Sequence, residues 1–513
     1  MFEYLSTAIV IVTTIFVIVY LYFKYISFNY WKKLNVPYES PSFPFGNVPI
    51  SYFLGYLPIG DLVKATYDRF KKHPFHGIYI FHKPILVVND PELVKIVLIR
   101  DFSKFIDRGW YHDEKTDPLS NNLFFQPGEK WRRLRGKFTP IFTPQKLKNI
   151  HGLMVTMANE MIKVMDEELE KSDTLEMMNI VRRFTTDIIC TVVYGLETGT
   201  LNNAQSEFRK YGMKIADFGR ITQLFAMFLP EVLENITIPF FNAETKNFFR
   251  DIFNQVVEYR REKNIVRKDM LNLLIQLVDK GSVEDEESTL GANDKDRNPD
   301  KVSMLEAAAQ AFIFFLGGIE TTSSTVSYCL LEMGLNPDIQ NKLQEEIDRV
   351  VESTEGVTYD ALMEMEYLEM VITETMRKYP PVALLNRMAL EDFPVPHSDF
   401  VIPKGMRIII PVTGLHNDPA HYPNPDKFNP SRQSKEQIAC RNPCLELAFG
   451  KGPRDCIGRR YGGVQSKQAV VSVLYRYNVR VSDKTKFPIT FNTENIIQQP
   501  GSGIYLHFEK RRK

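Results

Sequence analysis

The sequence predicts a mainly α-helical protein with small β-sheets, preceded by one membrane-spanning helix. Three observations support this fold class. An uncharged, mostly apolar run occupies residues 4–23, β-type runs lie near residues 78–88, and apolar residues recur at three- and four-residue spacing through much of the chain after residue 128. No Gly/Ser-rich linker divides the 513 residues, so we expect one large folded domain after the membrane helix.

The apolar run at the N-terminus is long enough, as a helix, to cross the roughly 30 Å hydrocarbon core of a bilayer. Lys24, Lys32 and Lys33 follow it, and Glu3 is the only charged side chain before it. The positive-inside rule therefore places the rest of the chain in the cytosol. A cleaved signal peptide is the alternative, but the basic start, short apolar core and small-residue cleavage site of such a peptide are not apparent. We predict a retained membrane anchor over residues 1–24.

Residues 25–50 are predicted to form a stiff, proline-rich hinge, and residues 51–513 the main domain. Proline lacks a backbone N–H and restricts its own backbone, so the hinge should be neither helix nor regular strand. The residues that impose this are Pro37, Pro41, Pro44, Gly46 and Pro49. Shortly after the hinge, the β-type runs at residues 78–80 and 84–88 predict a small sheet near the membrane end.

Most of the remaining chain carries helical patterns. The predicted helices span residues 144–170, 176–193, 203–217, 243–263, 303–335 and 337–352. The acidic, apolar-poor stretch from Gly281 to Asp300 is predicted to be an exposed loop. An aromatic cluster between Phe218 and Phe241 has two interpretations, core packing or contact with a membrane.

One cysteine lies in a glycine-rich loop just before a helical pattern, in the stretch Phe449-Gly-Lys-Gly-Pro-Arg-Asp-Cys456-Ile-Gly458. A helix N-terminus favours a thiolate, and glycines allow the backbone to approach a flat ligand. Arg454 is placed to reach an anionic group. The chain has five cysteines without a paired framework, so disulfides are not expected in a cytosolic body. The spacing favours a haem-thiolate site over an ordinary buried cysteine.

The loop resembles the haem-binding signature of cytochrome P450s, and other motifs follow in the order of that family. They are Gly317-Gly318-Ile319-Glu320-Thr321-Thr322, Glu374-x-x-Arg377 and Phe428-Asn429-Pro430-x-Arg432. Asp107-Arg108-Gly109, Trp131-x-x-x-Arg135 and the long anchor look most like microsomal enzymes of the insect detoxification type. The resemblance implies a cytochrome P450 fold, haem b as cofactor and insertion of one oxygen atom from O2 into a lipophilic substrate.

The resemblance assigns roles to individual residues. Cys456 is expected to be the axial ligand of the haem iron, with Phe449 beside the cofactor. Haem carboxylates are expected to bind Arg454, Trp131 and Arg135, with Arg387 and Arg108 as weaker candidates. Glu374, Arg377 and Arg432 are expected to form a buried structural triad. The implied pocket walls are Phe124, Phe125, Phe312, Phe315, Leu316, residues 382–385 and Gly503. The resemblance also implies that the aromatic region between Phe218 and Phe241 dips into the bilayer and roofs a substrate entrance.

Gly317 and Gly318 interrupt the apolar pattern of a long predicted helix, so we expect a local bulge there. A threonine hydroxyl backed by a carboxylate can relay protons to bound oxygen, and by resemblance Thr321 and Glu320 occupy that acid and alcohol pair. Alone, such a cluster would more often be a polar helix stripe satisfied by backbone and water. Together with the Cys456 loop it favours oxygen activation.

Electrons must come from another protein, because the chain lacks flavin and dinucleotide fingerprints. We expect NADPH-cytochrome P450 reductase as partner, cytochrome b5 as a second candidate, and a location in the endoplasmic reticulum membrane. A basic docking face is predicted from Lys130, Arg132, Arg133, Lys137, Lys451, Arg459, Arg460 and Lys467. The formal net charge of zero gives no global basic bias toward nucleic acid, and we expect no nucleic-acid partner.

Two other functions remain open, a haem-thiolate isomerase or dehydratase that needs no external electrons, and a non-catalytic haem sensor. Three residues depart from the commonest family pattern. Ala448 replaces a frequent proline, Ser431 replaces the usual glutamate before Arg432, and Asp455 stands where asparagine is common. An acid beside the ligand bears on iron potential and on reductase docking.

Overall fold

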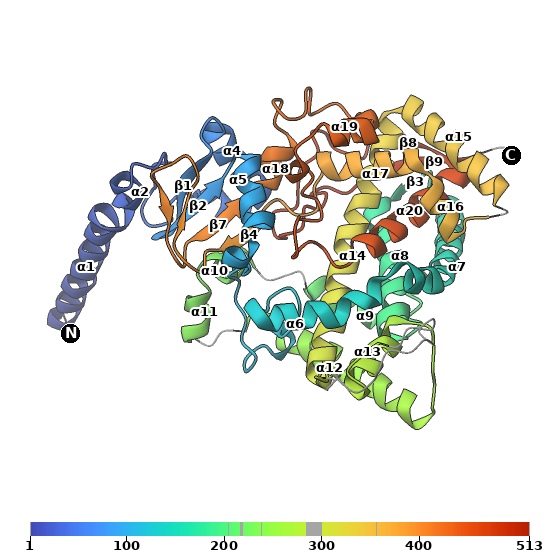
Figure 1. Cartoon of the computed structure of the whole chain (residues 1–513), viewed down its shortest axis with the longest axis horizontal. Coiled ribbons are helices and arrows are strands. Elements are labelled where there is room, and N and C mark those ends of the chain that lie inside the picture. Colours follow the sequence, from blue (N-terminus) through green and yellow to red (C-terminus); the bar gives the residue numbers. More distant parts are fainter. Residues whose placement is uncertain are drawn as a thin grey trace.

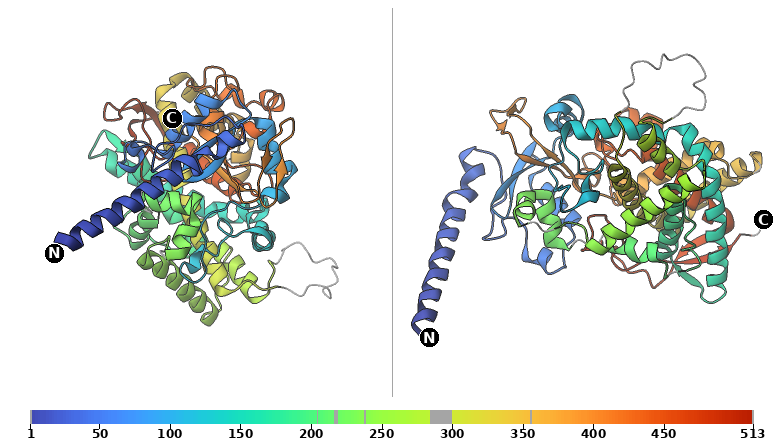
Figure 2. Two further views of the ribbon diagram at one scale, coloured as in Figure 1. Left: turned by 90° about the vertical axis from the view of Figure 1, so that its left-hand side faces the viewer. Right: turned by 90° about the horizontal axis from the view of Figure 1, so that it is seen from below.

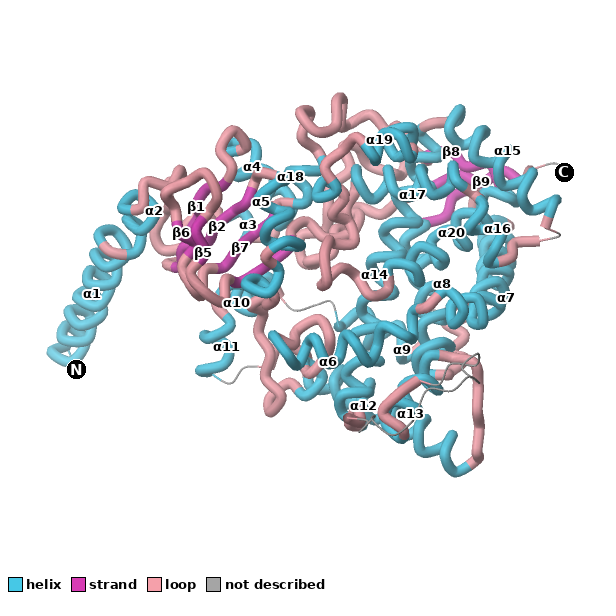
Figure 3. The backbone as a smooth tube through the Cα atoms, in the orientation of Figure 1, coloured by secondary structure: helices cyan, strands magenta, loops and turns pink. Residues whose placement is uncertain are grey.

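The computed structural model shows a long N-terminal helix that projects from a folded body (Figures 1 and 2). The structure describes residues 2–203, 205–215, 219–236, 239–283, 300–354 and 356–511. Strands gather in two places, one beside the N-terminal helix and one at the opposite end near the C-terminus, and helices fill the space between them (Figure 3). The fold is therefore mainly α with small sheets, as the sequence predicts.

The projecting helix, α1 (Phe2–Tyr25), leaves most of its described apolar side chains exposed, although Phe16, Tyr20 and Phe23 are in ring contact with Phe43. The apolar stretch that contains it has a mean hydropathy of 2.3 and none of its most apolar window is buried. One other described helix, α14 (Met304–Leu335), is long and apolar enough to span a membrane, but more than half of it is buried. Only α1 is thus both apolar and exposed, which fits a membrane anchor and leaves α14 as a core helix.

The segment after α1 is attached to the body rather than free. The short helix α2 (Tyr30–Lys33) carries Trp31, whose side chain is fully buried and donates from Nε1 to the carbonyl of Ile78 at 3.0 Å. The indole lies over Gly77, where a Cβ atom would come within 2.3 Å of the ring. The predicted hinge, residues 25–50, begins with the helical residues 27–33, whereas its proline-containing part, residues 37–49, contains no helix or strand longer than an isolated bridge.

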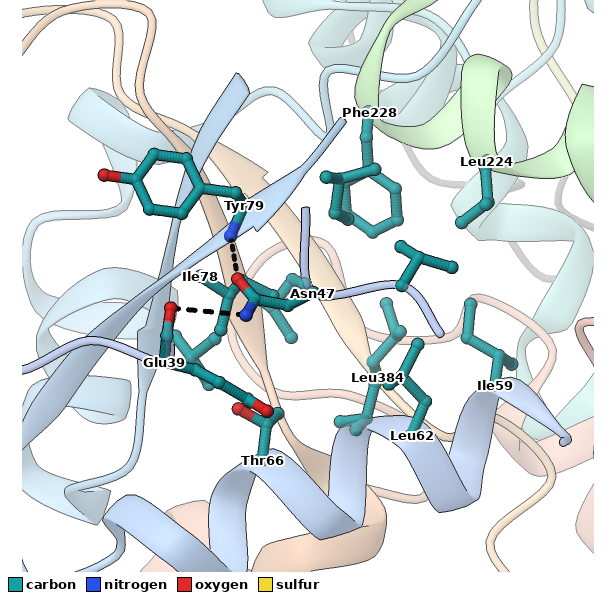
Figure 4. Close-up of a pocket in the computed structure, with 15 residues that line it drawn as sticks. Glu39, Asn47, Ile59, Leu62, Thr66, Ile78, Tyr79, Leu224, Phe228 and Leu384 are labelled. Carbon is teal, nitrogen blue, oxygen red and sulfur yellow. Dashed lines mark hydrogen bonds between the residues drawn. The ribbon is translucent and has the colours of Figure 1, made fainter. Parts of the chain in front are cut away.

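Figure 4 shows a small cavity under this segment. Asn47 holds its two walls together, because its side chain accepts a hydrogen bond from the Tyr79 N–H at 2.7 Å and donates to the Glu39 carbonyl at 3.2 Å. The cavity measures about 30 Å³, which is room for little more than one water. Its apolar lining includes Ile59, Leu62, Ile78, Leu224, Phe228 and Leu384. It is too small for a lipophilic substrate.

The sheet beside α1 has four strands in the order β1-β2-β7-β4. The strands are β1 (Phe75–Ile80), β2 (Lys83–Val88), β7 (Arg407–Ile410) and β4 (Leu385–Met388). The predicted runs at 78–80 and 84–88 form the antiparallel β1–β2 hairpin, whereas β2 pairs with β7 in parallel and β4 pairs with β7 antiparallel. A second sheet joins β3 (Thr174–Glu176), β9 (Tyr505–Lys510) and β8 (Tyr477–Val481), and β5 (Phe393–Pro394) pairs with β6 (Val401–Ile402).

The predicted helices are all present, because each has an apolar face that packs into one core. They are α7 (Pro144–Leu169), α8 (Met177–Ile189), α9 (Glu207–Ile215), α12 (Ala243–Glu262), α14, and α15 (Pro337–Ser353). The helical pattern after Cys456 forms α20 (Arg459–Arg476), and Glu374 and Arg377 lie on α17 (Glu366–Lys378). Helices not predicted individually include α4 (Ile59–Phe70), α6 (Gly128–Phe138), α10 (Arg220–Phe228), α11 (Pro230–Ile236), α13 (Met270–Asp279) and α16 (Tyr359–Glu364).

Helix α14 crosses the middle of the helical part (Figure 1) and contacts α8, α12 and α20. A capping box between Ser303 and Glu306 starts it. The predicted bulge is wrong, because every residue from Met304 to Leu335 is α-helical. The Thr321 hydroxyl donates to the Gly317 carbonyl at 2.6 Å without breaking the helix, and tight packing of α8 against Gly318 holds the two helices together.

The aromatic cluster of the sequence is part of the core. Phe228, Phe240 and Phe241 are buried, as are Leu224 and Leu229 around them. This favours core packing over direct membrane contact for these side chains. Phe218 and residues 284–299 of the predicted acidic loop lie outside the described part of the chain.

Candidate active site

A cavity of about 1060 Å³ lies between α14 and the Cys456 loop. It is large enough for a prosthetic group together with a lipophilic molecule. Its wall on the α14 side includes Ile313, Leu316, Gly317, Gly318, Thr321 and Thr322. The opposite wall includes Phe449, Gly450, Arg454, Cys456 and Ile457. The two motifs that the sequence singles out therefore face each other across one space.

The loop that carries Cys456 is shaped by close backbone contacts. Gly452 has a φ of 77°, and a Cβ atom there would lie 1.9 Å from the Leu98 carbonyl oxygen, so only glycine fits. The Cys456 N–H donates to the Phe449 carbonyl at 2.8 Å, which turns the side chain toward the cavity just before α20 begins at Arg459.

The Cys456 thiol is open to the cavity yet lies deep inside the protein. This burial raises the pKa of Cys456 above its usual value. A backbone hydrogen bond from Gly458 and the positive charges of Arg135 and Arg108 act in the opposite direction, toward the thiolate. A cation bound at the sulfur would complete that shift, since metal coordination deprotonates a thiol.

Three buried arginines line the cavity and face one another. Burial, together with mutual repulsion, lowers the pKa of Arg454 to about 8 and that of Arg387 to about 9, and burial lowers the pKa of Arg108 to about 10. None of the three forms an ion pair with an acidic side chain in the described part of the chain. Arg454 Nε and Nη1 and Arg387 Nε also have no hydrogen-bond partner there.

Such a cluster is an anion site, because guanidinium groups without acidic partners match carboxylates in charge and geometry. Trp131 adds an aromatic face, with the Arg454 guanidinium 4.5 Å from the ring centroid. The residues present therefore fit haem b, whose two carboxylates would meet Arg108, Arg387 and Arg454 while its iron meets Cys456. Phe449 and Trp131 line the same space.

Arg135 lines the cavity but differs from these three arginines because it has an acidic partner. Its guanidinium donates to the Asp455 side chain at 2.7 Å and to the Asp455 carbonyl at 2.8 Å. The residue that departs from the family pattern thus joins α6 to the loop of the cysteine ligand.

Glu320 and Thr321 are adjacent in sequence but point to different surroundings. Thr321 lines the cavity, whereas Glu320 is buried and is not among the described residues that line it. The Glu320 carboxylate accepts from Arg182 at 2.9 Å and from Gln499 at 2.6 Å. The structure therefore does not bring the Glu320 carboxylate and the Thr321 hydroxyl into direct hydrogen bonding.

Glu374, Arg377 and Arg432 lie together in a buried group. Arg377 makes two hydrogen bonds of 3.0 Å to the Glu374 carboxylate, and Arg432 Nε lies 3.3 Å from the same group. Gln433 adds a third side-chain donor to Glu374 at 2.9 Å. Both arginines thus lie against one carboxylate, so each has an acidic partner inside the chain, and the group keeps one net positive charge.

The pocket walls expected by resemblance are only partly correct. Phe124, Phe125, Leu316, Val382, Leu384 and Leu385 line the cavity. Phe312 and Phe315 are instead buried among α12 aromatics on another side of α14, each in ring contact with Phe249. Ala383 and Gly503 are also absent from the described lining residues. Sequence spacing cannot separate these helix faces because the whole of α14 is apolar.

The predicted basic face is smaller than expected. Lys467 is buried and pairs with Glu369 at 2.9 Å, so it cannot belong to a surface. Lys130, Arg132, Arg133 and Lys451 each have an acidic partner. Lys137 donates to the Gly281 carbonyl at 2.8 Å. Arg459 and Arg460 are exposed and begin α20, three and four residues after Cys456.

Several residues of the site were not identified from the sequence. Arg182 and Gln499 hold Glu320, and Trp110, Met227, Phe240, Ile496 and Ile497 line the cavity. They come from segments distant in sequence and carry no motif, so no local signal marks them.

Comparisons with known proteins agree with this geometry. The family model for Cytochrome P450 matches residues 44–507. Cytochrome P450 6A1 of Musca domestica is 38% identical over 508 residues, 96% of this chain and 96% of that protein. Cytochrome P450 6a2 of Drosophila melanogaster is 37% identical over 501 residues, 96% and 97% of the two chains. Cytochrome P450 6k1 of Blattella germanica is 35% identical over 517 residues, 99% and 97% of the two chains. The chain therefore belongs to the cytochrome P450 family and is a haem-dependent monooxygenase similar to insect enzymes.

Proposed function

We propose that this enzyme inserts one oxygen atom of O2 into a lipophilic substrate, a xenobiotic or an endogenous lipid or hormone, and reduces the other atom to water. The observation that carries this proposal is that the Cys456 sulfur and the Thr321 hydroxyl face the same largely apolar cavity. Aromatic and aliphatic side chains of residues 110–125, of Phe240 and of α14 line this cavity. They favour apolar substrates because burying apolar surface drives binding.

Cys456 supplies the thiolate that binds the haem iron in this proposal, and haem so ligated activates O2 for cleavage of the O–O bond. Arg108, Arg387 and Arg454 orient the group through its carboxylates. The glycine at position 452 lets the loop backbone sit close to Leu98, which fixes the direction of the sulfur.

Thr321 is the proposed proton donor, because it lines the cavity. Its hydroxyl donates to the Gly317 carbonyl, the one hydrogen bond that the described residues give that hydroxyl. Glu320 is the proposed source of that proton. Since Arg182 and Gln499 hold its carboxylate, delivery requires a water between the two side chains or a change of Glu320 rotamer.

Electrons are proposed to come from NADPH through a separate NADPH-cytochrome P450 reductase, with cytochrome b5 as a second donor. The exposed Arg459 and Arg460, next to the ligand, suit an acidic flavoprotein surface. The exposed apolar helix α1 and the lysines after it support an endoplasmic reticulum anchor with the body in the cytosol.

Replacing the ligand tests the haem assignment. Cys456→Ala should abolish the red-shifted carbon monoxide band of the ferrous enzyme, because that band requires thiolate ligation. Persistence of the band would remove Cys456 from the proposal.

The proton relay is tested by Thr321→Ala, with Thr321→Ser as the matched control that keeps the hydroxyl. The alanine variant should consume NADPH with reductase but divert electrons to hydrogen peroxide, while the serine variant stays coupled to product. Turnover of a lipid hydroperoxide without reductase would instead establish an isomerase or dehydratase. Absence of any turnover with intact thiolate ligation would indicate a haem sensor.

A further inference from the structure

A fully buried carboxylate joins two segments that roof the cavity. The first roof segment, residues 110–125, contributes Trp110, Leu123, Phe124 and Phe125 to the lining. The second roof segment, residues 239–246, contributes Phe240 and leads into α12. Asp117 lies in the first segment, and its side chain has no exposed surface.

The Asp117 carboxylate accepts hydrogen bonds from three groups of the second segment, and the Tyr111 hydroxyl of the first segment lies beside it. The backbone N–H of Phe240 donates to one oxygen, and the N–H of Phe241 donates to the other at 3.4 Å. Lys246 donates to Asp117 Oδ1 at 2.7 Å and also to the Thr116 carbonyl at 2.7 Å. The Lys246 side chain is 11% exposed, so this ion pair lies almost entirely within the protein.

These bonds determine where two aromatic rings lie. Phe125 packs against Phe240 and Phe241, with ring centroids 6.0 and 5.8 Å apart. Phe241 in turn packs edge-on against Phe312 of α14 at 4.9 Å. The first segment is itself attached to α14, because the Leu123 N–H donates to Gln310 at 3.1 Å. Asp117 therefore links the second roof segment to a wall that is already fixed.

We propose that Asp117 is a positioning residue for substrate binding, which holds Phe240 over the cavity and keeps the roof closed between the two segments. Opening the roof here separates the buried Asp117 carboxylate from the Lys246 ammonium group and from the two backbone N–H groups that donate to it. The contact between the two roof segments therefore hinders the entry of bulky ligands. This inference rests on the proposed use of the cavity as the substrate site.

The test follows azole binding to the iron of the full-length haem protein by stopped-flow absorbance. Imidazole is the small probe and triphenylmethylimidazole the bulky one. Asp117→Asn and Lys246→Met should each speed association and dissociation of the bulky azole by about tenfold, because the buried pair is lost. Imidazole rates should stay within about twofold of those of the wild type.

Glu244→Gln is the matched control. Glu244 lies in the first turn of α12, within the second roof segment, and pairs with Lys214 at 3.0 Å, but that pair is exposed and makes no ion pair with Asp117 or Lys246. Its bulky-azole rates should equal those of the wild type. The carbon monoxide difference band gives the folded fraction of each variant, and Lys246→Met retains the two backbone bonds if Asp117→Asn folds poorly.

Unchanged bulky-azole rates in both variants would overturn the role of Asp117, as would an equal acceleration of imidazole, which indicates general loosening. If the wild-type protein bound imidazole but not the bulky azole at any concentration, the proposed use of the cavity for lipophilic substrates would fall, and this inference with it.

Discussion

Two groups of buried arginines in this molecule have opposite electrostatic character. Arg377 and Arg432 share the carboxylate of Glu374, whereas Arg108, Arg387 and Arg454 lie together without an acidic partner in the described residues. Burying a cation without an acidic partner is costly, so the second group is suited to bind an anion. The difference separates scaffold from binding site: arginines that pair with an acid of the chain support the fold, whereas arginines without an acidic partner suit an anionic ligand.

The first prediction removes the carboxylate that Arg377 and Arg432 share, and it has the largest expected effect. Glu374→Gln should lower the free energy of unfolding by about 3–5 kcal/mol, because it leaves Arg377 as an uncompensated buried charge. Urea unfolding followed by circular dichroism measures the change. The matched control is Glu509→Gln, which removes an exposed pair with Arg480. A loss below about 1 kcal/mol for Glu374→Gln would contradict the scaffold role.

The second prediction removes one arginine from the group of Arg108, Arg387 and Arg454. Arg454→Gln should weaken haem binding by about 1.5–3 kcal/mol, the usual contribution of a hydrogen bond to a charged group, and so speed haem transfer to apomyoglobin by roughly 10- to 100-fold. Unlike Glu374→Gln, it removes an uncompensated charge instead of creating one. Arg480→Gln, on the surface, serves as control. Equal haem release from both variants would show that the cluster does not hold the cofactor.

The third prediction concerns the pH dependence of stability and His416. The backbone carbonyl of His416 accepts a hydrogen bond from Arg377 at 3.0 Å. Its Nε2 accepts the Leu447 N–H at 3.0 Å, and burial lowers the pKa of His416 to about 3. The unfolded chain binds this proton near pH 6.5, so it holds more protons than the native state between about pH 6.5 and 3.

Stability must therefore fall as the pH drops through that window, by up to about 1.4 kcal/mol per unit for this group. His416→Asn should remove that share of the slope between about pH 6.5 and 5.5, measured by urea unfolding at each pH. His397→Asn, at an exposed histidine, should leave the slope unchanged. An unaltered slope in His416→Asn would show that the buried ring does not contribute.

The smallest effect is expected for Arg135, which shares a feature with each of the two groups. Arg135 lines the cavity but pairs with Asp455, and their side chains are 21% and 34% exposed. A partly exposed pair contributes below about 1 kcal/mol, so Asp455→Asn should change the free energy of unfolding by less than that. Arg135→Gln should speed haem release less than Arg454→Gln does. The reverse order would mean that Arg135, despite its partner, is the main carboxylate ligand.

Much of the fold could be predicted because its signals are local. The helices α7, α12 and α15 begin and end within one residue of the predicted positions, since apolar spacing and an initial proline or asparagine cap define them. The β1–β2 hairpin follows from two adjacent β-type runs. The Cys456 loop was found in the same way, because glycines, arginine and cysteine at fixed spacing are contiguous.

The failures involve contacts between distant segments. Lys467 looked like a surface charge, yet it is buried against Glu369 from another helix. Phe315 looked like a pocket wall, yet it faces Phe249 of α12. An all-apolar helix such as α14 has no polar face to indicate its orientation, so periodicity cannot tell which side meets the cavity.

The sequence by itself determined the apolar N-terminal helix, the mainly α-helical class, the cysteine loop and the family, because these depend on composition and on residues close together in the chain. The tertiary structure alone decided that Glu320 pairs with Arg182, that Asp117 pairs with Lys246, and that Arg108, Arg387 and Arg454 have no acidic partner among the described residues. Charge compensation depends on which segments meet in space. Segments more than a hundred residues apart meet only when the whole core has formed.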